Sequence, residues 1–336
     1  MPTPAKPLRT AVVGLGWWGK YITQRLADSP RFEVTHGVDT AAGVAEFARR
    51  HHLALERSLE AVLANDAVDA VVIATPHSAH AAQVVAAAAA GKQVFCEKPL
   101  ALTAADAERI LAACDAAGIV LGIGHERRFE PAMEALARTI AAGTLGRILH
   151  LEANFSHDLF ARMEAGNWRV GAQDAPAGAM TALGVHLTDL FISFAGRPRA
   201  VRARTARVRP EAAGVDHVSV WLDFASGATG AVTCLSATPF HGHLAVFGTD
   251  GWIEVRENAN VDKRQPSDLV HCDAAGARKA SSFAAIDTVR LNLESWARAV
   301  AGEAPYRYTR EQLLDNVRVL DAVVRSADAD GRLVEL

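Results

Sequence analysis

The chain has 336 residues, of which 50% are hydrophobic and 22% are charged, the composition of a globular protein rather than of a disordered one. At about 150 residues per domain, this length predicts two domains. The 35 basic and 38 acidic side chains give a net charge of −3, without the basic excess of nucleic-acid binders. No apolar run is long enough to span a bilayer. Neither nucleic acid nor a membrane is therefore an expected partner.

Two features indicate a reducing, non-secretory environment. The segment Met1–Thr10 is rich in proline and lacks the apolar core of a secretory signal. The four cysteines are Cys96, Cys114, Cys234 and Cys272, and no two of them form a C-x-x-C pair. The sequence therefore shows neither a zinc knuckle nor an evident disulfide framework. We therefore expect a cytoplasmic protein without a bound metal.

Strand and helix patterns alternate in the first part of the chain. After a short apolar run at 10–14 we expect helix 17–27, strand 32–39, helix 41–51, strand 70–75, helix 78–90, strand 93–96, helix 103–117 and strand 119–123. Thr103 with Asp106 resembles a capping box, and Gly118 suits the end of the same helix. The alternation predicts a doubly wound parallel sheet covered by helices, over residues 1–125.

The pattern changes after Arg127. Residues 131–142 are typical of a helix, and strand patterns follow at 148–155, 200–208, 217–224, 229–236, 243–247 and 252–255. Several of these alternate polar and apolar residues, as a sheet with two different faces does. Residues 257–285 carry no clear pattern, and helices are expected at 287–301 and 310–327. We predict an α+β domain over 126–336 with a largely antiparallel open sheet, whose last helix could pack back on the first domain.

The segment Gly14-Leu-Gly16-Trp-Trp-Gly19 has the pattern G-x-G-x-x-G between the first predicted strand and helix, the context in which this pattern binds a dinucleotide. Gly14 permits the tight turn, Gly16 lets the backbone approach the pyrophosphate, and Gly19 allows close packing of helix on strand. Trp17 and Trp18 would lie beside this phosphate site at the helix start. The alternative is a glycine-rich turn that binds no dinucleotide.

Asp39 ends the second predicted strand, 20 residues after Gly19. A carboxylate at this place accepts hydrogen bonds from the adenosine ribose and repels a 2′-phosphate. The following residues include no arginine that would hold such a phosphate. The sequence therefore favours NAD as the cofactor, and NADP stays open because Arg49 or Arg50 could reach across.

Glu97-Lys98-Pro99 directly follows the predicted strand 93–96. A lysine at the carboxyl end of a parallel strand projects into the crevice where such sheets bind ligands, and the X-Pro bond behind it can be cis. Considered alone, Lys98 could equally be a surface lysine. Its combination with the glycine pattern makes it a candidate catalytic residue.

Several motifs resemble those of the Gfo/Idh/MocA family of NAD(P)-dependent dehydrogenases, which includes glucose–fructose oxidoreductase and inositol dehydrogenase. The resemblance covers nearly the whole chain and rests on the glycine pattern, Asp39, Ala74-Thr-Pro-His77 with His80, Glu97-Lys98-Pro99, Arg128-Phe129-Glu130-Pro131, Trp168-Arg169 and Gly184-Val-His186 with Asp189. It implies a Rossmann domain and a second, open-sheet domain. It also implies hydride exchange between a nicotinamide and a secondary alcohol or ketone of a sugar, cyclitol or related polyol.

The resemblance further implies roles for single residues. His186 would take the proton of the substrate alcohol, a task that suits an imidazole, and Lys98 would stabilise the developing alkoxide. Asp189 would orient a neighbour rather than react. Cofactor contacts would come from Thr75, Pro76, His77, His80, Glu97 and Lys98. Substrate contacts would come from Trp168, Arg169, His125 and Thr181.

The chain departs from the family pattern at the expected substrate site. Ala182 stands four residues before His186, where family members commonly carry an aspartate. Candidates that could replace this carboxylate are Thr181, Asp174, Asp158 and His157. Three other departures add titratable groups near the expected pocket and indicate an unusual substrate or proton path; they are His77, His125 and Glu126.

Three functions fit these observations. The leading hypothesis is an NAD-dependent oxidoreductase acting on a carbohydrate-like alcohol or ketone. A lyase or glycosidase that returns the hydride is the second, and the lack of a carboxylate at Ala182 is compatible with it. The third is a non-catalytic NAD-dependent sensor, against which the presence of Lys98 and His186 argues. Because an alternating sheet leaves one face to be covered, we expect a homodimer or homotetramer.

Overall fold

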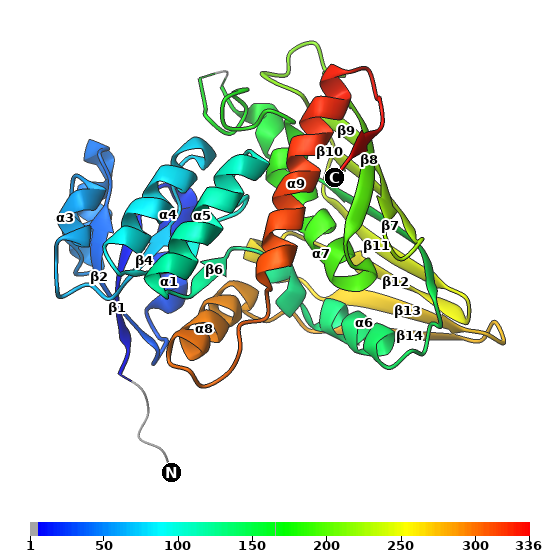
Figure 1. The fold of residues 1–336 in the computed structure, drawn as a ribbon, viewed down its shortest axis with the longest axis horizontal. Coiled ribbons are helices and arrows are strands. Elements are labelled where there is room, and N and C mark those ends of the chain that lie inside the picture. Colours follow the sequence, from blue (N-terminus) through cyan, green and yellow to red (C-terminus); the bar gives the residue numbers. More distant parts are fainter. Residues whose placement is uncertain (1–5, 165) are drawn as a thin grey trace. The chain divides into compact units, whose positions relative to one another are not determined.

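The computed structural model describes residues 6–164 and 166–336, so the first five residues of the segment considered above as a signal lie outside the described residues. By its internal contacts the chain forms two units (Figure 1). The first contains the chain up to Glu126 together with Val289–Arg310, and the second contains Arg127–Thr288 and Glu311–Leu336.

The first unit is built on a six-stranded sheet in which all neighbouring strands run parallel. Its order, β3-β2-β1-β4-β5-β6, is that of a doubly wound dinucleotide fold. The strands are β1 (Leu8–Val13), β2 (Phe32–Val38), β3 (Ala54–Glu56), β4 (Ala70–Ile73), β5 (Gln93–Cys96) and β6 (Leu121–Ile123). The helices are α1 (Trp17–Leu26), α2 (Ala45–Arg50), α3 (Leu59–Leu63), α4 (His80–Ala89), α5 (Ala104–Ala117) and α8 (Thr288–Val300), with 3₁₀ turns η1 (Ala42–Val44) and η2 (His77–Ala79).

Local signals explain where these elements begin and end. β4 is completely buried, as its uninterrupted apolar run predicts. The Thr103 hydroxyl accepts a hydrogen bond from the N–H of Asp106 at the start of α5, and Gly118 ends the helix with a φ of +64°. The strand order of the first unit reverses between β1 and β4, and open α/β sheets bind ligands at the carboxyl ends of the strands on either side of such a reversal. We call the segments 14–19, 74–80 and 97–99, which leave the sheet at the carboxyl ends of its strands, the switch edge.

The segment 289–310, which the sequence analysis assigned to the second domain, packs into the core of the first unit. Trp296 on α8 is completely buried, and its ring lies 6.1 Å from that of Phe32 and 5.6 Å from that of Phe95. These long-range aromatic contacts have no local signal in the sequence. The last helix, α9 (Arg310–Asp328), belongs almost entirely to the second unit.

The second unit is built on a nine-stranded sheet of order β14-β13-β12-β11-β7-β10-β9-β8-β15. β7 and β10 pair in parallel, and the other neighbouring pairs are antiparallel. The sheet is therefore mixed, and the prediction that it is largely antiparallel is confirmed. The strands are β7 (Ile148–Ser156), β8 (Pro198–Ala206), β9 (His217–Phe224), β10 (Thr229–Leu235), β11 (His241–Gly248), β12 (Gly251–Glu257), β13 (Ser267–Asp273), β14 (Arg278–Phe283) and β15 (Val334–Glu335).

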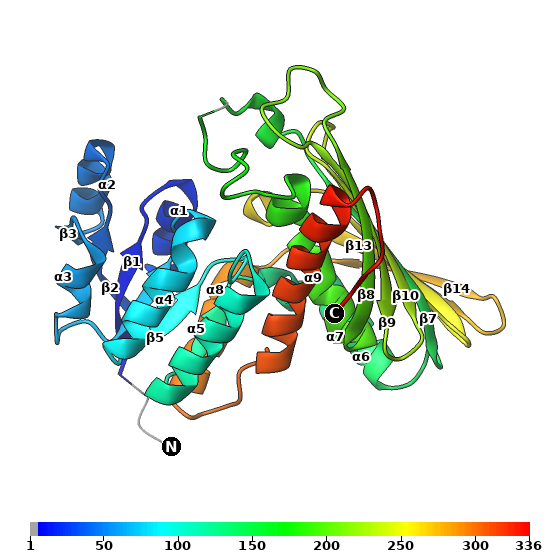
Figure 2. The ribbon, with the colours of Figure 1, turned by 45° about the horizontal axis from the view of Figure 1, so that its top comes forward.

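Helices lie on one face of this sheet (Figure 2); they are α6 (Pro131–Ala141), α7 (Val185–Ala195) and α9. α7 contacts β7 and β10, and α6 contacts β12, β13 and β14. The hydroxyl of Ser326 on α9 accepts a hydrogen bond from the N–H of Ala203 on β8 at 2.9 Å. Shorter helical turns are η3 (Glu126–Phe129), η4 (Phe160–Arg162), η6 (Val261–Lys263) and the π-helical turn η5 (Met180–Gly184).

Some elements have no counterpart in the sequence prediction. Residues 180–195 form η5 and α7, but nearly all of their side chains are buried, so the polar–apolar periodicity of a surface helix is missing. β13 and β14 occupy much of the polar stretch 257–285, and most residues of β14 are exposed. β3 and α3 are three and five residues long, too short for a periodic pattern.

Three further observations concern the described part of the chain. None of its helices is both long and apolar enough to cross a membrane. The four cysteines are buried and form no disulfide. Within the same residues, no group of three or more histidine, cysteine, aspartate or glutamate side chains is arranged to hold a metal ion.

Candidate active site

The glycine pattern forms the turn between β1 and α1. Gly14 has a φ of +92°, and a Cβ added there would lie 2.7 Å from the carbonyl oxygen of Ala74. A Cβ on Gly19 would lie 1.8 Å from the Gly14 carbonyl oxygen, so α1 packs here at a distance that only glycine allows. A Cβ on Gly16 would meet no heavy atom of the described residues within 4 Å. Open backbone at the start of a helix fits the pyrophosphate of a dinucleotide.

Asp39 connects the end of β2 to the glycine turn. Its carboxylate accepts hydrogen bonds from the N–H groups of Leu15 at 2.7 Å and Ala41 at 2.8 Å. Because a carboxylate offers about four acceptor positions, capacity remains for the hydroxyls of a ribose. The position predicted from the sequence therefore fits an adenosine ribose.

The arginines near Asp39 are not arranged as the sequence analysis considered. Arg49 and Arg50, the two candidates for a 2′-phosphate, both pair with a glutamate of their own helix, at 2.7 and 3.5 Å. Arg57, which follows β3, donates from Nη1 to the carbonyl oxygens of Asp39 and Ala41, each at 3.2 Å. It is thus Arg57 that brings a guanidinium beside Asp39.

Two tryptophans begin α1 next to the glycine turn. Trp18 stacks on Tyr21 with ring centroids 5.1 Å apart, and Trp17 lies tilted against Trp18 at 5.2 Å. Trp17 is 52% exposed, whereas Trp18 is partly buried. Trp17 therefore presents an accessible aromatic surface beside the turn, and Trp18 belongs to the packing around it.

The completely buried ring of His80 connects two segments of the switch edge. Its Nδ1 lies 2.8 Å from the carbonyl oxygen of Pro99, and its Nε2 lies 3.1 Å from that of Thr75. His77 is buried, and its ring lies 5.7 Å from that of His80. Pro76 lies between Thr75 and this pair. The imidazole therefore lies between the end of β4 and the turn after β5, and in its neutral form it donates to one of these two carbonyl oxygens.

Glu97 and Lys98 leave β5 at the same edge, and the Lys98–Pro99 peptide is cis. The Glu97 carboxyl packs on the backbone of Gly124, where an added Cβ would lie 2.3 Å from Oε2. Burial, followed by the charge of Glu126, raises the pKa of Glu97 to about 8, although Lys98 and a hydrogen bond lower it. Near pH 7 the carboxyl beside Lys98 is therefore mainly protonated.

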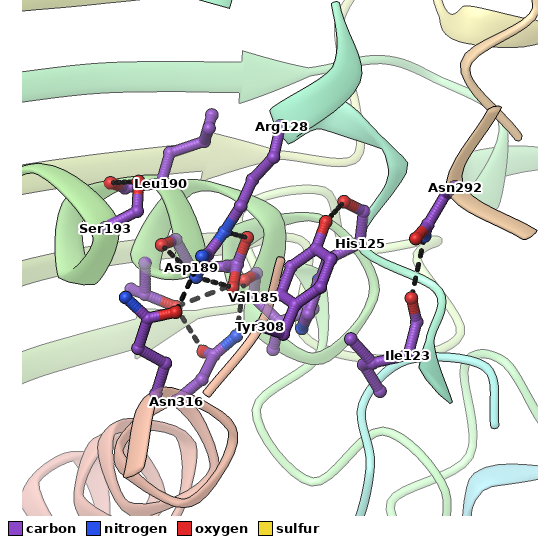
Figure 3. Close-up of polar contacts among 12 residues, drawn as sticks. Ile123, His125, Arg128, Val185, Asp189, Leu190, Ser193, Asn292, Tyr308 and Asn316 are labelled. Carbon is purple, nitrogen blue, oxygen red and sulfur yellow. Dashed lines mark hydrogen bonds and ion pairs between the residues drawn. The ribbon is translucent and has the colours of Figure 1, made fainter. Parts of the chain in front are cut away.

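His125 follows β6 and is buried. The hydroxyl of Tyr308 donates to the carbonyl oxygen of His125, and Nδ2 of Asn292 donates to that of Ile123 at 2.7 Å (Figure 3). The rings of His125 and Tyr308 lie 6.4 Å apart. The segment 289–310 thereby fixes the backbone that leads out of β6 and sets the position of His125 within the first unit.

His186 lies at the start of α7, directly after the π-helical turn η5. Such turns inside helices often occur at functional sites. Its side chain is buried and meets the ring of Phe155 edge-on, with centroids 6.2 Å apart. The guanidinium of Arg127 stacks on the same ring at 3.9 Å and pairs with Glu257. The imidazole therefore lies in an aromatic environment with little access to bulk water.

Side chains from other elements hold α7 in the second unit (Figure 3). Arg128 donates to both carboxylate oxygens of Asp189, from Nε at 2.8 Å and from Nη2 at 2.6 Å, and both side chains are buried. Asn316 on α9 donates to a backbone carbonyl of α7 at 3.0 Å and accepts from the hydroxyl of Thr188 at 2.7 Å. Because Asp189 lies one turn after His186, these contacts also orient His186.

Trp168 and Arg169 lie in the loop between η4 and η5 and are partly buried. The Arg169 guanidinium stacks on the Trp168 ring at 4.2 Å, and Arg169 lines a cavity of the second unit together with Ala182. Thr181 is completely buried, and its hydroxyl accepts from the N–H of Ala177 at 3.4 Å. Of these residues, Arg169 and Ala182 border the cavity, whereas the hydroxyl of Thr181 is hydrogen-bonded to the backbone of Ala177, before η5 begins.

The candidates for replacing the carboxylate at Ala182 differ in their surroundings. Asp158 pairs with an arginine one turn away at 2.7 Å, and its side chain is 42% exposed. Asp174 is buried. His157 is buried and packs edge-on against Phe155 with centroids 5.5 Å apart, on the same ring that His186 contacts. His157 is therefore the candidate that shares a contact with His186.

The supporting residues that were not predicted from the sequence include Arg57, Glu257 and Asn316. Asn316 reaches α7 across 128 residues of sequence, and Glu257 reaches Arg127 across 130. A polar residue on the apolar face of an amphipathic helix is a detectable signal, and Asn316 carries it. No comparable local pattern marks Arg57 or Glu257.

Comparison with known proteins decides the family. The family model GFO_IDH_MocA, described as "Oxidoreductase family, NAD-binding Rossmann fold", matches residues 8–125, and the "GFO/IDH/MocA C-terminal domain" matches residues 133–254. D-xylose 1-dehydrogenase (NADP(+)) 2 of Haloferax volcanii is 35% identical over 281 residues, which cover 83% of this chain and 84% of that protein. The chain belongs to the Gfo/Idh/MocA family.

Other relatives agree with this membership. Trans-1,2-dihydrobenzene-1,2-diol dehydrogenase of Sus scrofa is 30% identical over 254 residues, 74% of each chain. The crystal structure of GenD2 from gentamicin A biosynthesis, in complex with NAD, has a TM-score of 0.84 at 26% identity and covers 99% of this chain and 97% of that one. The predicted family, fold class and oxidoreductase class are confirmed. These two relatives differ in the cofactor that they are named with, which is NADP for the xylose enzyme and NAD for GenD2.

Proposed function

We propose that this Gfo/Idh/MocA enzyme oxidises a secondary alcohol of a sugar, cyclitol or related polyol, or reduces the corresponding ketone, with NAD as its cofactor. The switch edge carries the proposal, because the glycine turn and Lys98 leave one parallel sheet at the same edge, near Asp39. The relatives named as D-xylose and dihydrodiol dehydrogenases support the substrate class.

The residues of the switch edge fit a dinucleotide. The backbone at Gly16 is open and precedes the N-terminus of α1, whose N–H groups attract phosphates. Asp39 has acceptor capacity for ribose hydroxyls. A nicotinamide bound there would supply the acceptor for the hydride of the carbinol carbon, so that the alcohol becomes a carbonyl compound.

Residues of the chain accept the proton of the substrate hydroxyl and stabilise the negative charge on the substrate oxygen. His186 takes the proton of the substrate hydroxyl on its imidazole and later releases it to solvent. Lys98 stabilises the negative charge that develops on the substrate oxygen. The ion pair of Arg128 with Asp189 keeps α7, and with it the imidazole, in position.

We infer NAD rather than NADP from the carboxylate of Asp39, which lies at the glycine turn through its bond to Leu15 and would repel a 2′-phosphate. Arg57 is the residue that could favour NADP, since its guanidinium lies on the loop that follows Asp39. The kinetic preference between the two cofactors tests this part of the proposal.

We also propose a cytoplasmic homodimer or homotetramer. On β9, Trp221 is 43% exposed, and its ring lies 5.5 Å from that of His150, which in turn lies 6.2 Å from that of Phe247. An exposed aromatic cluster on a sheet is typical of an association surface. Light scattering should give a mass of two or four chains, and Trp221→Asp should lower it. A monomeric wild-type enzyme would exclude this assembly.

The first experiment follows nicotinamide absorbance after stoichiometric enzyme and NAD are mixed with sugars, cyclitols and sugar acids. NADH that accumulates over many turnovers supports the dehydrogenase. A signal limited to one enzyme equivalent, or one that rises and decays, would indicate that the hydride returns to the substrate. NAD binding without any signal across the panel would indicate a sensor.

Lys98→Ala tests the proposed catalytic group directly. We expect it to bind NAD normally in calorimetry and to lose about 100-fold or more in kcat/KM, because removing one group that stabilises a developing oxyanion costs about 10²–10³. Lys279→Ala, at an exposed lysine on β14, is the matched control and should turn over like the wild type. Undiminished turnover by Lys98→Ala would refute the assignment.

A further inference from the structure

One arginine of the second unit differs from the other buried arginines in its surroundings. Arg127 and Arg128 each form an ion pair with a carboxylate. The guanidinium of Arg169 is partly buried, yet among the described residues it forms neither an ion pair nor a hydrogen bond, and it stacks on Trp168. Burial lowers the pKa of Arg169, and no neighbouring carboxylate offsets this effect. Within the part of the chain that the structure describes, this charge therefore has no neutralising group.

The charge borders a cavity that lies within the second unit. Arg169, Ala179 and Ala182 line the cavity, which is partly open and has an enclosed volume of about 20 Å³. One carboxylate, that of Asp216, also borders it. Its two oxygens accept hydrogen bonds from backbone N–H groups of residues 208–209 at 2.7 and 3.0 Å. The cavity thus combines the Arg169 guanidinium with small side chains and with a carboxylate whose oxygens are already bonded to backbone N–H groups.

The chemistry of a guanidinium identifies that group. A partly buried charge without a partner is costly, and a guanidinium forms its strongest contacts with planar or tetrahedral oxyanions through two parallel hydrogen bonds. Stacking on Trp168 holds the plane of Arg169 in place, which lowers the entropic cost of such binding.

We propose that Arg169 and this cavity bind an anionic group of the substrate, so that the substrate is an acidic sugar or polyol carrying a carboxylate or a phosphate. Ala182 lines the same cavity with a side chain of a single methyl group. The identification of the ligand as a sugar or polyol rests on the proposed function, whereas the requirement for an anion rests on the cavity.

Binding of three compounds that differ only at one carbon tests the proposal. Calorimetry with the NAD-bound enzyme uses D-glucose, D-glucuronate and D-glucose 6-phosphate as probes. We expect at least one of the two anions to bind about tenfold or more tightly than glucose, and the tighter of the two distinguishes a carboxylate from a phosphate. Equal or weaker binding of both anions would overturn the proposal.

Variants of two arginines, one in the loop after η4 and one at the end of η4, separate the site from general charge effects. Arg169→Gln should weaken the preferred anion by roughly 30-fold or more, as expected when one partner of a desolvated charge pair is removed, and should change glucose binding by less than about threefold. Arg162→Gln is the control, because Arg162 is 81% exposed and pairs with Asp158. Equal losses of affinity for the anion in the two variants would contradict the proposal that Arg169 forms the anion site.

Ala182 offers a second, independent pair of variants. Ala182→Asp and Ala182→Asn add nearly the same volume, but only the aspartate can neutralise Arg169. We expect the Asp variant to lose about tenfold more anion affinity than the Asn variant. Identical losses would count against the proposal, and this pair decides the question even if Arg169→Gln fails to fold.

The readout also separates this inference from the proposed function. Tight, Arg169-dependent binding of an anion without NADH formation from any probe or panel compound would support the anion site and contradict the dehydrogenase. Turnover of neutral sugars with no preference for anions would support the dehydrogenase and contradict the anion site.

Discussion

The switch edge of the first unit and the surroundings of α7 in the second unit are built from different kinds of atoms. At the switch edge the closest contacts involve the main chain, such as the carbonyl oxygen of Gly14 beside Gly19. Around α7 the decisive contacts join side chains of separate elements, such as Arg128 and Asp189. One region depends on missing side-chain atoms, and the other depends on paired ones.

This difference determines how each region can be damaged. A site that relies on the absence of a Cβ is damaged when atoms are added, because the backbone itself must move. A site that relies on a buried ion pair is damaged when one partner is removed, because the remaining charge stays buried. Adding atoms at the switch edge and removing charges around α7 should therefore have different consequences.

The largest effect is expected from Asp189→Ala. The variant leaves the buried guanidinium of Arg128 without its carboxylate, which should lower the free energy of unfolding by about 3–5 kcal/mol. Urea denaturation followed by circular dichroism measures the change. The double variant Arg128→Met/Asp189→Leu replaces both charges by apolar groups and should lose less than the single variant. A double variant that is the less stable of the two would contradict this explanation.

Addition of one methyl group should damage the switch edge. In Gly19→Ala the new Cβ would lie 1.8 Å from the Gly14 carbonyl oxygen, so the turn must shift, at a cost of about 1–3 kcal/mol. We expect NAD affinity, measured by calorimetry, to fall about tenfold or more. Gly166→Ala is the control, because an added Cβ there meets no heavy atom of the described residues within 4 Å. Equal affinities for NAD in the two variants would show that close packing at Gly19 is dispensable.

The same contrast explains how much of the fold could be predicted from the sequence. Elements with a local signal were found, such as β4 with its continuous apolar run and α5 with Thr103 and Gly118 at its ends. α7 was missed because its side chains are buried on nearly all sides. The contribution of α8 to the first unit was missed because Trp296 meets Phe95 only through the tertiary fold.

The candidate site follows the same division. The glycine turn and Lys98 were predictable because a strand, a turn and a proline act within a few residues. The partner of Arg128, the contact of Asn316 with α7 and the position of Arg57 beside Asp39 depend on residues far apart in the sequence. Sequence patterns also could not show that Arg169 has no carboxylate partner among the described residues, because that property depends on all of its neighbours in space.

A pH-dependent effect should arise at Glu97. Its pKa is raised from 4.5 to about 8, by burial first and then by the charge of Glu126. Between these values the folded state binds more protons than the unfolded state. The contribution of Glu97 to the free energy of unfolding is therefore fully present below about pH 4.5 and is lost as the pH rises toward 8. The slope from this group is at most about 1.4 kcal/mol per pH unit.

Glu97→Gln removes this titration and keeps a neutral side chain of the same shape. In denaturant titrations between pH 5 and 9, the variant should lose less stability with rising pH than the wild type and should become the more stable of the two at the alkaline end. Glu60→Gln, at an exposed glutamate of α3, is the control and should follow the wild type. Parallel pH profiles of wild type and Glu97→Gln would mean that Glu97 is ionised in the folded state throughout this range.

The smallest effect is expected at the cofactor's ribose. Arg57 is exposed and held by two carbonyl oxygens of the loop after β2, so it could contact a 2′-phosphate only as a solvated ion pair, worth about 0.2–1 kcal/mol. Arg57→Ala should therefore lower kcat/KM with NADP by about two- to fivefold and leave the value with NAD nearly unchanged. Arg49→Ala is the matched control, because Arg49 is engaged with Glu46.

If Arg49→Ala shifts the ratio of kcat/KM with NAD to kcat/KM with NADP more than Arg57→Ala does, the ion pair of Arg49 with Glu46 on α2 opens to the cofactor. The contact of Arg57 with the loop after β2 is then incidental. If Arg57→Ala alone shifts it, cofactor preference depends on a side chain from beyond β3, even though Asp39 and the main chain form the rest of the ribose site.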